Sequence, residues 1–122
     1  MPLNAWSRLP RKQLVNVDQF VALDLRAGVV TAVDAFPEAR KPAWKLEVDF
    51  GPVIGRLWTS AQITNYRRDE LLGRVVVGIV NLVPKRIAGF ESQFLVLGAV
   101  AADGTVQLLE LPDDVAPGTP IA

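Results

Sequence analysis

Residues 75–98 have the sequence VVVGIVNLVPKRIAGFESQFLVLG, in which two apolar, β-branched runs are joined by a loop of different character. The runs, at 75–82 and 94–97, predict two strands because β-branched residues favour extended backbone. The loop between them holds a proline, two adjacent cations, a glycine and a serine. An ordinary connection between strands does not require this combination of residues. We therefore predict a site in this loop, and its cations indicate an anionic partner.

Strand patterns continue on both sides of this stretch. Residues 21–33 alternate and are interrupted by Gly28, which predicts a long strand with a bulge or corner at the glycine. Residues 44–50 alternate apolar and charged, the pattern of a strand with one buried face. The run at 75–82 is almost continuously apolar, so both of its faces are expected to be covered. Weaker patterns predict strands at 56–61, 94–100 and 106–111, and a short helix at 67–72 that ends at Gly73.

The order of these elements favours one all-β fold with short helices. Helices of the length that βαβ units need are missing, which argues against a parallel α/β sheet. The order suits a five-stranded Greek-key barrel of the oligonucleotide/oligosaccharide-binding (OB) type with terminal extensions, while an SH3-like barrel or a small sandwich stays open. In an OB barrel the loops between strands one and two and between strands four and five flank the ligand groove. Those loops here carry Arg40 with Lys41 and Lys85 with Arg86.

Composition limits the chemistry. The 122 residues are half hydrophobic, enough for one domain with a packed core, and they include neither cysteine nor histidine. Disulfides and thiolate nucleophiles are thereby excluded, and a transition-metal site would have only oxygen ligands. No nucleophile–base pair or phosphate-loop motif is present, so we predict no enzyme, no cofactor and no metal. No apolar run approaches the length of a membrane span, and we expect a cytoplasmic protein.

The charges cancel in number but not in position. The sequence has thirteen cations and thirteen anions, and all the cations lie between Arg8 and Arg86. Eight anions share that region, whereas the five that follow Ile87 have no cation among them. Such asymmetry can produce a basic face on a neutral molecule, or it can be uneven scatter of solvated charge. The charge counts leave both readings open.

Polar residues near the cation pairs complete the predicted site. Asn81, Ser92 and Gln93 are short hydrogen-bonding side chains that can contact sugar hydroxyls or base edges. Ser60 and Gln62 follow the third predicted strand, where they could also merely satisfy backbone groups at the strand end. Lys45 alternates with apolar neighbours and is expected to point outward, and Trp58 is the best candidate for stacking on a base. A polar hairpin with a solvated cation pair is the alternative interpretation.

The loop resembles a known family. Its Asn-Leu-x-Pro-x-Lys/Arg-x-x-Gly-x-x-Ser pattern is that of the tRNA-binding domain, which occurs alone and as an appendage of some methionyl-tRNA synthetases. In this chain the pattern is matched by Asn81, Leu82, Pro84, Arg86, Gly89 and Ser92. The segments PEARKP at 37–42, SAQIT at 60–64 and PKRIAGF at 84–90 resemble the CsaA group, export-related chaperone-like proteins. The likeness covers about residues 18–122 and leaves 1–17 as an N-terminal extension. Trp58-Thr59 and Leu82-Val83 depart from the family pattern, and both departures are expected to weaken RNA affinity.

The resemblance implies an OB fold, a homodimer and tRNA binding, with the holding of unfolded precursor proteins or peptides for export as the alternative function. It implies no insertion into a membrane. We predict that RNA is bound by a groove comprising Arg40, Lys41, Lys45, Ser60, Gln62, Asn81, Lys85, Arg86, Ser92 and Gln93.

Overall fold

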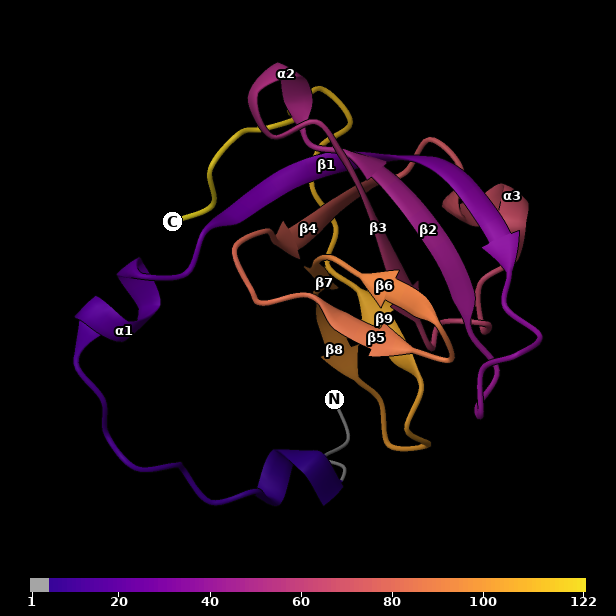
Figure 1. The fold of residues 1–122 in the computed structure, drawn as a ribbon. Coiled ribbons are helices and arrows are strands. Elements are labelled where there is room, and N and C mark those ends of the chain that lie inside the picture. The colour runs from indigo at the N-terminus through magenta and orange to yellow at the C-terminus, as the bar shows by residue number, and fades with distance from the viewer. Residues whose placement is uncertain (1–4) are drawn as a thin grey trace.

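Five antiparallel strands form the central sheet, in the order β3-β2-β1-β4-β7 (Figure 1). The computed structural model describes residues 5–122, and its sheet consists of β1 (Leu25–Ala35), β2 (Trp44–Asp49), β3 (Arg56–Ala61), β4 (Val75–Ile79) and β7 (Leu95–Val96). The two edges of the sheet approach each other, because the backbone N–H of Gln93 donates to the carbonyl of Trp58 at 2.7 Å, immediately before β7. The sheet is therefore a nearly closed barrel, which confirms the predicted all-β fold class.

Two hairpins and four short helices complete the described chain. The hairpins are β5 (Lys85–Ile87) with β6 (Phe90–Ser92) and β8 (Gly98–Val100) with β9 (Val106–Leu108). The helices are η1 (Ala5–Arg8), α1 (Val17–Val21), α2 (Gly51–Ile54) and α3 (Arg68–Leu71), the last confirming the short helix predicted at 67–72. None of the helices in residues 5–122 combines the length and the apolar character needed to span a membrane.

The core follows from the alternation in the sequence. Leu46 and Val48 of β2 are fully buried, and Phe50 packs edge-to-face on Phe94 with ring centroids 5.0 Å apart. All five residues of β4 are buried, as predicted for a strand with both faces covered. Its second face packs in a separate apolar cluster composed of Leu25, Val77 and Ile79, with Leu97, Leu111 and Ile121 against them.

Three sequence predictions need correction. The strand predicted at 21–33 begins only at Leu25, because Val21 ends α1. Its irregularity lies between Val30 and Ala32, not at Gly28, which pairs regularly with β4. A side chain at Gly28 would lie 2.8 Å from the Phe50 ring, so close packing explains that glycine. The strand predicted at 94–100 is broken, because β7 pairs with β4 whereas β8 pairs with β9.

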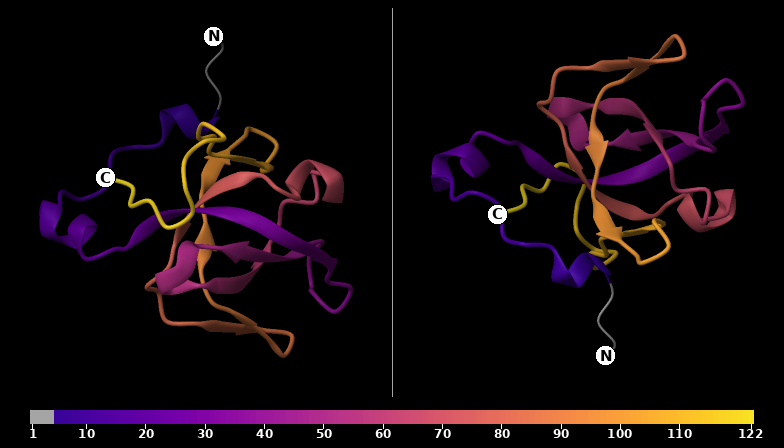
Figure 2. Two further views of the ribbon diagram at one scale, coloured as in Figure 1. Left: turned by 90° about the horizontal axis from the view of Figure 1, so that it is seen from above. Right: turned by 90° about the horizontal axis from the view of Figure 1, so that it is seen from below.

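The segment that precedes β1 lies outside the barrel (Figures 1 and 2). It consists of η1, a connection over residues 9–16, and α1, none of whose residues is buried. The indole N–H of Trp6 donates to the carbonyl of Ala101, which fixes η1 to the connection between β8 and β9. We call residues 9–21 the N-terminal arm.

Candidate nucleic-acid interface

The β1–β2 loop and the β5–β6 hairpin enclose a cavity against the end of β3. Its volume is about 220 Å³, and it is lined by Ala39, Arg40, Lys41, Ala43, Ser60, Gln62 and Ile87. Four of these, Arg40, Lys41, Ser60 and Gln62, are residues that the sequence analysis assigned to an RNA-binding groove. The barrel therefore brings together predicted site residues that come from two distant parts of the sequence. We call this the loop–hairpin cavity.

One wall of the cavity is the β5–β6 hairpin, whose turn has two residues. Ile87 pairs with Phe90, and between them Ala88 and Gly89 have φ angles of 48° and 82°. Positive φ at both central residues is the property of a type I′ turn, whose twist matches that of the flanking strands. Gly89 supplies the second position without strain, because glycine has no Cβ.

Hydrogen bonds attach the base of this hairpin to β3. The Ser92 hydroxyl lies 2.9 Å from that of Thr59 and accepts from the Ser60 backbone N–H at 3.3 Å. The Gln93 side-chain carbonyl accepts from the Trp58 backbone N–H at 2.9 Å. Ser92 and Gln93, both predicted as RNA contacts, thus position the hairpin on the sheet.

An aromatic cluster with a lysine at its centre joins the hairpin to the β1–β2 loop. Phe90 of the hairpin packs edge-to-face on Phe36 at 5.4 Å and on Trp58 at 6.4 Å between ring centroids. The Lys45 ammonium lies 4.7 Å from the centre of the Phe36 ring and 5.1 Å from that of Phe90. Such cation–π contacts contribute about 0.5–1 kcal/mol each at exposed sites. Lys45 is therefore half-buried among rings, and Trp58 is half-buried rather than presented for stacking.

The predicted Lys85–Arg86 pair is divided between the two faces of the hairpin. Lys85 pairs across the hairpin with Ser92, and Arg86 with Glu91. The Arg86 guanidinium lies 3.8 Å from the Glu91 carboxylate and donates to the carbonyl of Gly89 at 2.9 Å. Its charge is thus partly neutralised within the hairpin.

Lys85 borders a second recess of about 200 Å³ at the base of the hairpin. This apolar recess is lined by Leu82, Val83, Lys85, Ser92, Gln93, Phe94 and Leu95. Val83 is 91% exposed and Leu95 48% exposed. The recess could accept apolar groups, whereas the loop–hairpin cavity combines cations with free polar groups.

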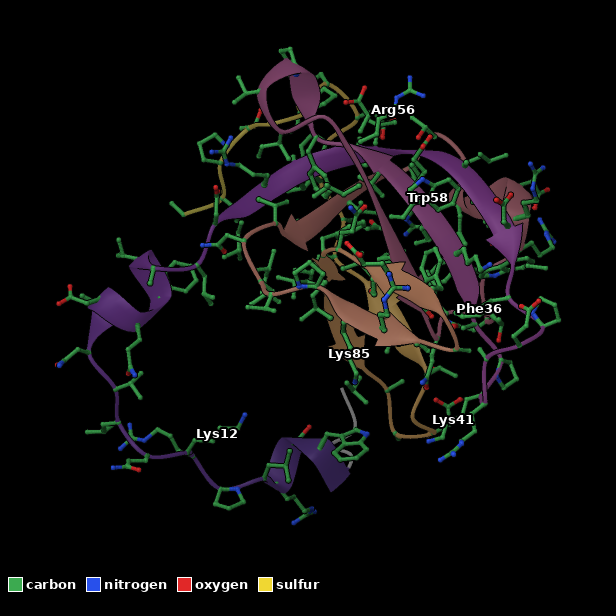
Figure 3. The ribbon with its side chains drawn as sticks, in the orientation of Figure 1. Lys12, Phe36, Lys41, Arg56, Trp58 and Lys85 are labelled. Atoms are coloured by element: carbon green, nitrogen blue, oxygen red, sulfur yellow. The ribbon has the colours of Figure 1, made fainter. Side chains whose placement is uncertain are left out.

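Charge at the loop–hairpin cavity is uncompensated. Among the described residues, Arg40, Lys41 and Lys85 form no ion pair, and the cavity lining contains no carboxylate. Figure 3 shows Lys41 on the β1–β2 loop and Lys85 on β5. Three exposed cations without partners provide a surface for an anionic chain. No group of three or more carboxylates in residues 5–122 could hold a metal ion.

The sequence did not assign Phe36, Ile87 or Phe90 to the site, nor the lining residues Ala39 and Ala43. Ile87 and Phe90 lie inside the motif that the sequence analysis quoted, and their pairing across two residues containing a glycine was the signal for a hairpin. Phe36 adjoins the loop prolines and resembles an ordinary core aromatic, so the sequence offered no signal for it.

Asn81, also predicted as an RNA contact, is not among the lining residues of either cavity, and its side chain makes two hydrogen bonds within the chain. Its side-chain carbonyl accepts from the Asp24 backbone N–H and its amide donates to the Ala22 carbonyl, both at 2.8 Å. Asn81 thereby holds the turn between α1 and β1.

Two known groups of proteins are similar to this chain. A family model described as "Putative tRNA binding domain" matches residues 25–120. The methionine–tRNA ligase of Porphyromonas gingivalis (strain ATCC 33277) is 32% identical over 112 residues, which cover 92% of this chain and 16% of the ligase. That of Salinibacter ruber is 41% identical over 91 residues, 75% of this chain and 12% of the ligase. The chain therefore spans only a small fraction of the ligases it matches.

Solved structures agree over most of the chain. The CsaA chaperone protein from Picrophilus torridus is 47% identical with a TM-score of 0.84, and the match covers 89% of this chain and 100% of that one. CsaA from Bacillus anthracis is 46% identical with a TM-score of 0.84, covering 90% and 100%. A MetRS-related protein from Pyrococcus horikoshii is 30% identical with a TM-score of 0.81, covering 91% and 100%.

The Asn81 contacts lead to a prediction about stability. Asn81→Ala removes two hydrogen bonds and should lower the free energy of unfolding by about 1–2 kcal/mol, measured by urea denaturation. RNA affinity of the folded protein should change less than about twofold, because the amide is already occupied. The matched control is Asn65→Ala, since Asn65 is also exposed but makes a single hydrogen bond, to the Val106 carbonyl. A loss of RNA affinity without a loss of stability would show that Asn81 contacts RNA directly.

Proposed function

This chain belongs to the tRNA-binding domain family and is CsaA-like within it, and we propose that it binds structured RNA, tRNA in particular, as a homodimer. The RNA lies across the loop–hairpin cavity, with Arg40, Lys41 and Lys85 on phosphates. The observation that carries this proposal is the set of three unpaired cations on the two loops that border the cavity. Binding of this type reads RNA shape and backbone, with few base contacts.

Among the other predicted contacts, Lys45 and Arg86 take a supporting part in this proposal. Lys45 is held between two rings and adds positive potential beneath the hairpin. Arg86 is exposed on the outer face of the hairpin, where a phosphate would compete with Glu91 for its guanidinium. Ser92 and Gln93 contribute by fixing the hairpin to β3.

The homodimer is supported by the apolar surface of the N-terminal arm. Leu14, Val15, Val17 and Val21 are each 69–75% exposed, and Phe20 is 46% exposed. Several exposed apolar side chains on one short segment favour an interface over solvent. We therefore place a second copy of the chain against the arm.

A second function is favoured by a different observation. The apolar recess beside Leu82 and Val83 offers exposed hydrophobic surface that could hold a segment of an unfolded precursor protein. Two of the similar solved structures are described as CsaA chaperones. Peptide held in this way should respond little to salt, because the recess includes one cation only.

The RNA proposal predicts a steep salt dependence. If three phosphates are neutralised for each bound tRNA, tRNA affinity should fall about 20- to 40-fold between 50 and 200 mM salt, measured by fluorescence anisotropy. Lys41→Ala and Lys85→Ala should each reduce the slope of log affinity against log salt by about 0.7–0.9. Arg67→Ala is the control, because it removes the same charge at a site already paired with Asp69 and Glu70.

Absence of tRNA binding at low salt would contradict the proposal and leave the peptide-holding function to be pursued. Equal effects of Lys41→Ala and Arg67→Ala would contradict the assigned site while retaining RNA binding.

The dimer proposal predicts a change of mass. Val17→Ser together with Phe20→Ser should convert a particle of twice 13.3 kDa into one of 13.3 kDa in light scattering. Val53→Ser is the control, since Val53 is 92% exposed on α2, outside the arm. A wild-type protein that is monomeric at micromolar concentration would refute the dimer.

A further inference from the structure

We infer that the loop–hairpin cavity binds one unpaired nucleotide, with its base inside the cavity and its phosphate on the rim. This inference rests on the proposed RNA-binding function and adds that recognition requires an unstacked base. Contact with a base distinguishes this cavity from a surface that binds RNA by charge alone.

Size and lining suit a single flat ring. The volume of about 220 Å³ is below the roughly 300–1,000 Å³ of pockets that take drug-sized ligands. Ala39, Ala43 and Ile87 provide an apolar lining, and Ala43 is 7% exposed. Small apolar side chains on the walls leave the space open for a base to insert.

Free hydrogen-bonding groups lie where the edge of a base would be read. Gln62 and Ser60 both line the cavity, and the side chain of neither makes a hydrogen bond with another described residue. An amide offers a donor and an acceptor side by side, which complements the Watson–Crick edge of a base. The Ser60 backbone N–H donates to the Ser92 hydroxyl, so the backbone that carries the Ser60 side chain is held in place before binding.

The charge of the lining favours a nucleotide over a peptide segment. Arg40 and Lys41 both contribute to it, and no carboxylate does. A peptide backbone carries no net charge, whereas each nucleotide carries one phosphate, which the ribose joins to its base. Cations next to a base-sized apolar space match that combination.

The hairpin wall is held in place without a ligand. The Lys45 ammonium between Phe36 and Phe90 and the hydrogen bonds of Ser92 and Gln93 fix it at two points. A preformed cavity loses less conformational freedom when a ligand enters, which raises affinity.

The test compares two RNAs that differ only in their bases. One is a stem–loop with an ordinary single-stranded loop, and the other has the same stem and the same number of phosphates but abasic loop nucleotides. The wild-type protein should bind the ordinary RNA about 10-fold more tightly, the discrimination expected for about 1.4 kcal/mol of base contacts. Gln62→Ala should weaken binding of the ordinary RNA by most of that factor and leave the abasic RNA unaffected. Gln107→Ala is the control, because Gln107 is exposed on β9 and does not line the cavity.

A second variant fills the space instead of removing a contact. Ala39→Leu should also abolish the preference for the ordinary RNA, with folding checked by circular dichroism. Equal, salt-sensitive binding of both RNAs by the wild type would overturn the nucleotide inference and leave the RNA-binding function intact. Binding of neither RNA at low salt would overturn both. If Gln62→Ala instead weakens the binding of an unfolded-peptide probe and leaves RNA binding unchanged, the cavity binds peptide and the inference is overturned.

Discussion

The attachment of the β5–β6 hairpin to β3 is the constraint on which the site depends. The hairpin forms one wall of the loop–hairpin cavity, yet its three-residue strands are too short to be stable alone. Thr59, a buried polar residue, donates to the Phe94 carbonyl at 2.7 Å and contacts the Ser92 hydroxyl at 2.9 Å. Because buried hydrogen bonds are costly to leave unmade, these contacts fix where the hairpin meets the sheet. The aromatic contacts of Phe90 then hold its far end.

Local pairing of charges explains how a chain with no net charge can present a basic site. Several cations elsewhere are neutralised locally, such as Arg26 by Asp24 and Arg67 by Asp69. The cations of the β1–β2 loop and the first residue of the hairpin have no such partners among the described residues. Local pairing, and not overall composition, therefore determines where the positive potential remains.

The sequence predicted the barrel well because its strands have strong patterns. Alternation at 44–50 and the apolar run at 75–82 correspond to β2 and to the fully buried β4. The grouping of Arg40 and Lys41 with Ser60 and Gln62 was also predictable, since barrel topology places their segments together. The order of the strands was enough to predict that these segments lie close together.

Other features depend on tertiary contacts that no local pattern encodes. Lys45 was expected to point outward and does so, but the rings that surround it come from distant segments. The pairing of Arg86 with Glu91 follows from the register of a hairpin too short to show periodicity. Gly28 was predicted to mark a bulge, whereas the Phe50 ring that requires the glycine belongs to another part of the chain.

We propose that RNA occupies the face between the β1–β2 loop and the hairpin. Titration of isotopically labelled protein with tRNA, followed by amide chemical shifts, tests it directly. If RNA lies on this face, the largest changes will fall on residues 39–43, on Ser60 and Gln62, and on β5. Changes confined to the N-terminal arm or to the apolar recess around Val83 and Leu95 would contradict it.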